Sequence, residues 1–356
     1  MMLRDMGGAD LVSQGMDSIV THANVKPPIQ HGGDPKAAEV HFGVPKDGWL
    51  DLSTGINPVA YPLGAVPQKR FARLPLKSEC DAILEAARRA YSVPEKAAIV
   101  ASPGTQALIQ MVPTLFAPSS VSIMGPTYGE HAPAWTAAGH ELEDVGSICA
   151  QAAQPAPFGV VVHPNNPDGR TQTVEGLLAF AEELHGRGGI LVVDEAFADV
   201  TPDLSVTPHA GDDGLVVLRS FGKFFGLAGV RLGFAVTTFE IAEQLEEKLG
   251  PWAVSGPALW AGEQALRDPD WIATTRVRLQ ADAARLDALL QRSGLDIVGG
   301  TDLFRLAQSP KAQDIYQQLG RAGILVRPFA YRPDWLRFGL PGCEEDWVRL
   351  ENALRS

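Results

Sequence analysis

The sequence reads ILVVDE at residues 190–195, a short apolar run that ends in two carboxylates. Similar apolar runs occur on both sides of it, at residues 97–101, 121–124, 158–162, 215–218 and 232–236. Runs that are apolar at every position are typical of strands buried on both faces of a sheet. Amphipathic segments such as residues 174–186 separate several of these runs. This alternation predicts an α/β fold whose mostly parallel central sheet lies between helices.

The chain of 356 residues is long enough for two domains. Residues 1–25 show little periodicity and are expected to form an N-terminal lead-in. We expect residues 26–60 to contribute to the substrate site and the small domain, and residues 61–250 to form the large domain. Residues 251–356 are expected to form a smaller α+β domain. In it, residues 258–293 have a long helical pattern, whose arginines are interpreted as a solvated face.

The composition excludes several classes of protein. Apolar residues make up 45% and charged residues 20%, which is ordinary for a globular chain and excludes a disordered one. There are 42 acidic and 30 basic residues, a net charge of −12, which argues against a nucleic-acid partner. No apolar stretch approaches the roughly 18 residues of a membrane helix, so no membrane partner is expected. Cys80, Cys149 and Cys343 are too far apart for a disulfide framework or metal site, and a reducing, cytoplasmic location fits them.

Lys223 lies in the segment SFGKFFGLAGVRLG, residues 220–233, directly after a predicted strand. Small and apolar neighbours would remove its amine from water and lower its pKa toward a neutral amine that attacks carbonyl groups. A loop lysine whose stem lies on apolar surface is the alternative, and on its own it is the simpler one. The surrounding residues favour the reactive lysine.

Three elements of the sequence suit a bound phosphate. Ser220 and Arg231 lie three residues before Lys223 and eight after it, and can offer a hydroxyl and a guanidinium to one phosphate. The earlier Gly104-Thr105 turn opens a helix predicted over residues 105–116, so its backbone amides offer another phosphate cradle.

Three other side chains suit a pyridine ring. Asp194 ends a predicted strand, where it can meet the cationic nitrogen of such a ring. Asn166, in a turn before Pro167, can hydrogen-bond a phenolate oxygen, and Tyr128 can stack on an aromatic face. Ligands of parallel α/β sheets bind at the carboxyl ends of strands, where most of these residues lie.

In this order, the residues resemble the motifs of fold-type-I, pyridoxal-phosphate-dependent enzymes of the class I/II aminotransferase superfamily. The resemblance spans about residues 30–350, and it implies pyridoxal 5′-phosphate as cofactor. It implies that Lys223 binds the cofactor covalently and shuttles protons, with Asp194 on the pyridine nitrogen and Asn166 on the ring hydroxyl. It also implies a homodimer with the site at the subunit interface. The phosphate would be held by Gly104, Thr105, Ser220 and Arg231, and Tyr128 would stack on the ring.

Two positions depart from that superfamily. Phe197 stands where many relatives have a tyrosine that bonds the ring hydroxyl oxygen, so the pKa of the lysine–cofactor linkage is expected to be higher. Leu74 stands where relatives often have a tyrosine that reaches the partner subunit's cofactor phosphate. A cross-subunit contact of that kind is not expected here.

Three motifs bear on the substrate: HGGD at residues 31–34, WLDLSTGINP at residues 49–58 and PWAVS at residues 251–255. They resemble the subfamily of carboxy-lyases that decarboxylates L-threonine O-3-phosphate in cobalamin biosynthesis. The resemblance implies a phosphorylated amino acid as substrate, with Arg337 on its carboxylate. The other residues implied to bind it are His31, Gly32, Asn57 and Arg327. The alternatives are a surface ion pair for Arg327 and a loop contact or helix cap for His31.

The orientation of the substrate decides the reaction in this superfamily. A Cα–carboxylate bond perpendicular to the cofactor ring leads to decarboxylation, whereas a perpendicular Cα–H bond leads to transamination. Residue types alone do not distinguish these orientations. An aminotransferase of the histidinol-phosphate kind and a non-catalytic ligand-sensing protein are therefore the alternatives.

Overall fold

The computed structural model describes residues 32–212 and 214–355. These described residues belong to one compact unit. The expected lead-in, residues 1–25, and the substrate candidate His31 lie outside the described residues. In the described part, no helix combines the length and apolar character needed to cross a membrane.

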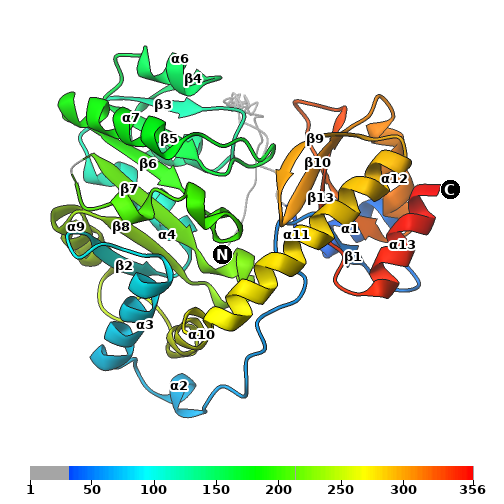
Figure 1. The fold of residues 1–356 in the computed structure, drawn as a ribbon, viewed down its shortest axis with the longest axis horizontal. Helices are drawn as coiled ribbons and strands as arrows, with labels where there is room; N and C mark the ends of the chain where they lie inside the picture. Colours follow the sequence, from blue (N-terminus) through cyan, green and yellow to red (C-terminus); the bar gives the residue numbers. More distant parts are fainter. Residues whose placement is uncertain (1–31, 213, 356) are drawn as a thin grey trace, which may run out of the picture. The chain divides into compact units, whose positions relative to one another are not determined.

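A seven-stranded sheet forms the centre of the larger part (Figure 1). Only β8 is antiparallel to its neighbours, while the remaining pairs are parallel. All six apolar runs are strands, within two residues of the predicted ends, which confirms the mostly parallel sheet. Its strands in spatial order are β2 (Ala98–Ser102), β8 (Gly233–Thr237), β7 (Leu215–Ser220), β6 (Ile190–Asp194), β5 (Phe158–Val162), β3 (Ser120–Met124) and β4 (Glu141–Val145).

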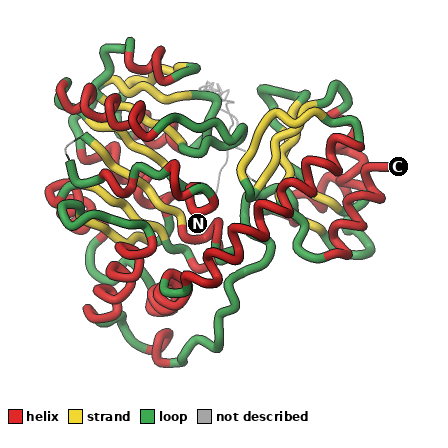
Figure 2. The backbone as a smooth tube through the Cα atoms, in the orientation of Figure 1, coloured by secondary structure: helices red, strands yellow, loops and turns green. Residues whose placement is uncertain are grey.

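The two faces of this sheet belong to two different hydrophobic cores. Along β5 and β6, Val161 and Val193 lie in one core while Val160 and Val192 lie in the other. Every position is therefore buried, which explains why the strands are apolar throughout. Helices cover both faces (Figure 2). The first core includes residues of α3 (Lys77–Ala90), α7 (Val174–Gly186) and α10 (Gly256–Leu266), and the second includes residues of α4 (Thr105–Met111), α5 (His131–Ala137) and α9 (Phe239–Leu249).

Two predicted helices differ from the structure, in both cases at a proline. The helix predicted over residues 105–116 ends as α4 at Met111, and a 3-10 turn, Val112–Leu115, follows it with Pro113 inside. The helical pattern over residues 258–293 is two helices, α10 and α11 (Pro269–Arg292), rather than one. Asp268 accepts a hydrogen bond from the Trp271 amide at 2.9 Å and caps α11, and proline suits the first helical position.

A four-stranded antiparallel sheet forms the C-terminal part, which agrees with the α+β expectation. Its order is β12 (Arg327–Pro328), β13 (Trp335–Gly339), β10 (Phe304–Gln308) and β9 (Asp296–Thr301). The N-terminal strand β1 (Leu50–Asp51) pairs in parallel with β11 (Ile324–Leu325). The division of the chain at residues 250 and 251 stays a prediction. The remaining helices are α1 (Pro35–Phe42), α2 (Lys69–Ala72), α6 (Ile148–Ala152), α8 (Phe221–Phe224), α12 (Ala312–Arg321) and α13 (Glu344–Arg355).

Candidate active site

A cavity of about 120 Å³ lies at the carboxyl ends of β5, β6 and β7. Seven of the eight residues predicted to bind a cofactor line it, and the eighth, Gly104, directly precedes Thr105. The strand order brings together side chains that are more than 100 residues apart in the sequence. The lining residues are Thr105, Gln106, Tyr128, Val162, Asn166, Asp194, Ala196, Phe197, Ser220, Lys223 and Arg231.

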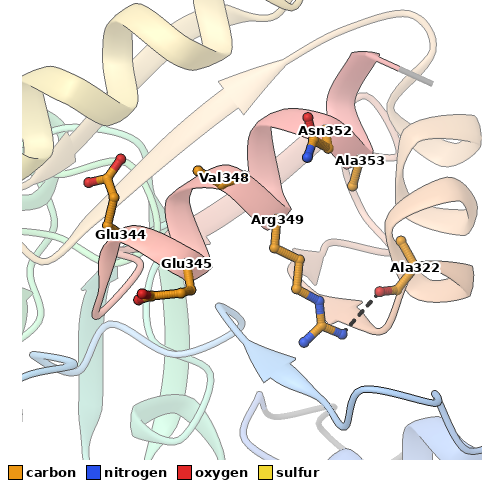
Figure 3. Close-up of a pocket in the computed structure, with 7 residues that line it drawn as sticks. All are labelled: Ala322, Glu344, Glu345, Val348, Arg349, Asn352 and Ala353. Carbon is orange, nitrogen blue, oxygen red and sulfur yellow. Dashed lines mark hydrogen bonds between the residues drawn. The ribbon is translucent and has the colours of Figure 1, made fainter.

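A larger hollow of about 660 Å³ lies along α13 (Figure 3). There Arg349 donates a hydrogen bond to the Ala322 carbonyl at 3.1 Å, and its other bonds also go to backbone carbonyls. Among the described residues, none of those predicted to bind cofactor or substrate lines this hollow. The smaller cavity, which contains Lys223 and Asp194, is the candidate active site.

Gly104, Thr105 and Arg231 pack closely around the expected phosphate position. Gly104 has a φ of +86°, and a Cβ placed there would lie 2.7 Å from Nη2 of Arg231. A Cβ at Gly233 would lie 2.5 Å from the Thr105 amide nitrogen. Ser220, the buried last residue of β7, adds a hydroxyl to the same cavity. The backbone amides, the Ser220 hydroxyl and the Arg231 guanidinium surround a space that Gly104, having no side chain, leaves open. Together they form a cradle that fits a phosphate.

A Gly104→Ala substitution is expected to weaken the binding of pyridoxal phosphate about tenfold. The new methyl group would displace Arg231, and a positive φ costs a non-glycine residue about 1–3 kcal/mol. Titration of the cofactor-free protein with pyridoxal phosphate, followed by absorbance, measures this affinity. Gly64→Ala is the matched control, because a Cβ there meets no atom within 4 Å. Unchanged affinity in Gly104→Ala would contradict the cradle.

Asp194 forms a buried pair with a histidine that the sequence did not indicate. Its Oδ2 lies 2.9 Å from Nε2 of His131, and its Oδ1 accepts a hydrogen bond from the Ala196 amide at 3.1 Å. Both side chains are almost completely buried. The His131 ring is edge-on to the Tyr128 ring, with centroids 6.1 Å apart. An imidazole that orients a buried carboxylate fits a site for a cationic ring nitrogen.

Lys223 lies in α8, directly after β7, and its amine faces an apolar wall. Nζ is 6.0 Å from the centroid of the Phe197 ring, which is edge-on to Phe304. Burial, together with the positive charge of Arg337, lowers the pKa of Lys223 to about 8, although Asp194 opposes this shift. Half of the amine is therefore neutral near pH 8, which a nucleophile and proton carrier needs.

Arg337 contacts both Asn166 and the N-terminal segment. It donates hydrogen bonds to Oδ1 of Asn166 at 2.5 Å and to the Ser53 carbonyl at 2.8 Å. Because a guanidinium only donates, the amide N–H₂ of Asn166 remains to donate to a ring hydroxyl oxygen. A Cβ at Gly32 would lie 2.4 Å from that same Ser53 carbonyl oxygen. Gly32 therefore lies close to the carbonyl that Arg337 contacts, and its role in binding the substrate stays a prediction.

Arg327 and Arg337 lie directly opposite each other on β12 and β13. Burial lowers the pKa of both guanidiniums, and the charge of Arg327 contributes to the pKa of about 10 for Arg337. Among the described residues, no carboxylate lies within ion-pair distance of either one, so the alternative of a surface ion pair is not observed. Like charges directly opposite each other on paired strands are destabilising. A doubly anionic ligand would remove this repulsion.

The Asn57 side chain is hydrogen-bonded within the protein. It is 2% exposed, and its amide contacts the Phe224 carbonyl, the Val59 amide and Arg278. These contacts place Asn57 in the scaffold of the site, and its role toward the substrate stays a prediction. The interpretation of the α11 arginines as a solvated face is wrong for two of them, since Arg278 contacts Asn57 and Arg276 donates to the Asp199 carbonyl.

The residues present fit pyridoxal phosphate. The cradle suits its phosphate, Asp194 its pyridine nitrogen, Asn166 its hydroxyl and Lys223 its aldehyde carbon. Fold and site together define a pyridoxal-phosphate-dependent enzyme, and the chain belongs to the aminotransferase class I and II family, whose sequence profile matches residues 75–354.

Individual proteins of known sequence or structure resemble this chain over most of its length. The chain is 42% identical to the threonine-phosphate decarboxylase of Pseudomonas aeruginosa over 332 residues, which covers 92% of this chain and 97% of the relative. It is 45% identical to a threonine-phosphate decarboxylase of Sinorhizobium, with coverage of 92% and 98%. The histidinol-phosphate aminotransferase of Sinorhizobium meliloti, solved with pyridoxal-5′-phosphate, shares the fold with a TM-score of 0.78 at 20% identity. That match covers 91% of this chain and 95% of the solved one.

Proposed function

We propose that this protein is a pyridoxal-phosphate-dependent carboxy-lyase. It converts L-threonine O-3-phosphate to (R)-1-aminopropan-2-ol O-2-phosphate and carbon dioxide, as a step of cobalamin biosynthesis. The observation that carries the proposal is the pair of opposed, partly desolvated arginines, because the substrate has two anionic groups. The two relatives named as threonine-phosphate decarboxylases support the choice of substrate.

The arginines orient the substrate. Arg337, fixed by Asn166 and Ser53, binds the carboxylate, and Arg327, on the neighbouring strand, binds the phosphate. Two fixed anion sites restrict rotation about the Cα bonds, so that one bond is held in the reactive direction. In decarboxylation the bond held in this direction joins Cα to the carboxylate.

Lys223 and Asp194 carry out the proton and charge chemistry. When bound, pyridoxal phosphate supplies an electron sink for the charge left on Cα. Asp194, held by His131, would stabilise a protonated pyridine nitrogen. Lys223 would hold the cofactor, and its side chain, when free and protonated, would deliver to Cα the proton that takes the place of carbon dioxide.

The decisive experiment supplies L-threonine O-3-phosphate to the holoenzyme and identifies the products. Carbon dioxide and aminopropanol phosphate are expected without any added keto acid. Glutamate formation that strictly requires 2-oxoglutarate and an amino donor would instead support an aminotransferase of the histidinol-phosphate kind. An absorbance band that shifts on borohydride reduction would show the lysine–cofactor linkage, and turnover of the substrate would exclude a non-catalytic ligand sensor.

An Arg327→Gln substitution is expected to lower kcat/KM for L-threonine O-3-phosphate about 10- to 100-fold, mainly by raising KM. The range corresponds to the loss of a charged hydrogen bond, about 1.5–3 kcal/mol. Steady-state kinetics measure the effect, and inhibition by inorganic phosphate should weaken in parallel. Arg332→Gln is the matched control, because that exposed arginine pairs with Asp334 at 3.0 Å. A wild-type KM in Arg327→Gln would contradict a phosphate site at this residue.

The proposed enzyme is a cytoplasmic homodimer. Four large apolar side chains are exposed on and beside α2 and before α10, namely Phe71, Leu74, Leu76 and Trp252. Large apolar side chains that stay exposed in one subunit are candidates for an interface, and family membership supports a dimer. Cys80 and Cys343 are free, which suits a reducing compartment. Light scattering of the purified holoenzyme tests the dimer.

A further inference from the structure

The backbone that carries Lys223 is held by a segment from the N-terminal part of the chain. Helix α8 has only one turn, so its last carbonyl groups need partners outside the helix. The backbone N–H of Asn57 donates to the Lys223 carbonyl at 2.9 Å, and the backbone N–H of Tyr61 donates to the Phe225 carbonyl at 2.9 Å. Between them, Nδ2 of Asn57 donates to the Phe224 carbonyl at 2.8 Å. Residues 57–61 thus cap three successive carbonyls, starting with that of Lys223.

The Asn57 side chain is itself fixed from the other side. Its Oδ1 accepts hydrogen bonds from the Val59 amide at 3.0 Å and from Nη2 of Arg278 at 2.7 Å. Because Arg278 only donates, it fixes which end of the Asn57 amide faces the Phe224 carbonyl. Arg278 extends from α11, where Asp282 pairs with it at 3.0 Å. The side-chain amide of Asn57 is therefore oriented by a charged group, and it is too buried to contact a ligand.

The same N-terminal segment also reaches Arg337. The Ser53 carbonyl, four residues before Asn57, accepts a hydrogen bond from Arg337, and the Leu52 carbonyl accepts one from the Gly339 amide at 2.7 Å. One short stretch of backbone, residues 52–61, is thus bonded to the strand that carries Arg337 and to the turn that carries Lys223. This stretch therefore links the turn of Lys223 to the strand of Arg337.

We propose that Asn57, oriented by Arg278, is a positioning residue that fixes the backbone of Lys223 relative to Arg337 and does not bind the substrate. The kinetic part of this inference rests on the proposed function. Decarboxylation requires the substrate to be held at one angle, and a shift of about 1 Å in a reacting group can cost 10²-fold in rate. A loosened Asn57 contact therefore changes the chemical step and leaves the anion sites intact.

Asn57→Ala is expected to lower kcat for L-threonine O-3-phosphate about 10- to 100-fold while KM stays within about twofold. Arg278→Gln, which leaves Asn57 in place, should lower kcat about three- to tenfold. Asp282→Asn is the matched control, because it removes the other partner of Arg278 and retains the bond to Asn57; wild-type kinetics are expected. A KM raised tenfold or more with unchanged kcat in Asn57→Ala would make Asn57 a substrate ligand and overturn the proposal.

A second measurement does not depend on the substrate. Hydrogen exchange of the intact holoenzyme should be faster at residues 57–61 and 221–226 in Asn57→Ala and Arg278→Gln, and unchanged in Asp282→Asn. Unchanged exchange in both test variants would overturn the proposal even if kcat fell. If the wild-type protein does not decarboxylate the substrate, the proposed function fails while the exchange result still tests the positioning role. If Asn57→Ala does not fold, Arg278→Gln provides the same test, since that side chain is 31% exposed.

Discussion

A Lys223→Ala protein is expected to lose turnover by a factor of about 10³ or more, because one residue supplies both the covalent attachment and the proton carrier. It should also lose the adduct that borohydride traps between the protein and pyridoxal phosphate. Mass spectrometry of the reduced holoenzyme measures the adduct, and release of carbon dioxide from L-threonine O-3-phosphate measures the turnover.

The control for this variant is Lys96→Ala. The Lys96 amine pairs with Asp212 at the surface, and about half of its side chain is exposed. The control should keep both the adduct and the activity. Normal turnover in Lys223→Ala would end the assignment of this site. The lowered pKa of Lys223 gives a further check, since amine-reactive labelling of the cofactor-free protein should be half-maximal near pH 8 and rise above it.

The largest effect on stability is expected at Arg219, one residue before Ser220. Its guanidinium donates to Glu195 at 2.6 Å and to Asp199 at 2.8 Å, and it lies 4.3 Å from the centroid of the Tyr91 ring. All three charged groups are buried. Burial alone would lower the pKa of Arg219, but the charges of Asp199 and Glu195 raise this pKa. The guanidinium therefore remains charged.

Arg219→Gln is expected to lower the free energy of unfolding by about 3–5 kcal/mol, because it leaves buried carboxylates without their cation. Urea unfolding of the holoenzyme, followed by circular dichroism, measures the change. Arg267→Gln is the control. Arg267 pairs with Glu263 at the protein surface, and loss of this ion pair should lower the free energy of unfolding by less than about 1 kcal/mol. A change below about 1 kcal/mol in Arg219→Gln would show that the buried network does not contribute to stability.

The apolar runs predicted the large sheet because burial on both faces leaves a direct trace in residue type. Val192 and Val193 face different cores, so neither position tolerates a polar residue. The edge strand β4 escaped prediction because it reads ELEDV and is paired on only one side. A half-exposed strand has a weaker pattern of apolar residues, and the strand conformation of β4 depends on its pairing with β3.

The candidate site was predictable where a residue type occurs at a strand end, as Asp194 and Ser220 do. His131 was not predictable, because it is 63 residues from its partner Asp194 and starts an ordinary helix. The contacts of Asn57 were not predictable for a related reason. A motif gives the position of a residue in the chain, whereas the direction of its side chain depends on Phe224 and Arg278, which are 167 and 221 residues away.

The sequence of α11 is that of a surface helix, yet the contacts of its arginines constrain how many residues the helix can contain. Arg276 donates to the Asp199 carbonyl, Arg278 contacts Asn57, and Arg285 pairs with Glu344 of α13. Each added residue rotates a helix by about 100°. One residue inserted between Ile272 and Arg276 would turn all these side chains away from their partners unless the helix start moved to compensate. A change in the length of α11 therefore displaces several contacts at once, including the Arg278–Asn57 bond beside the lysine of the active site.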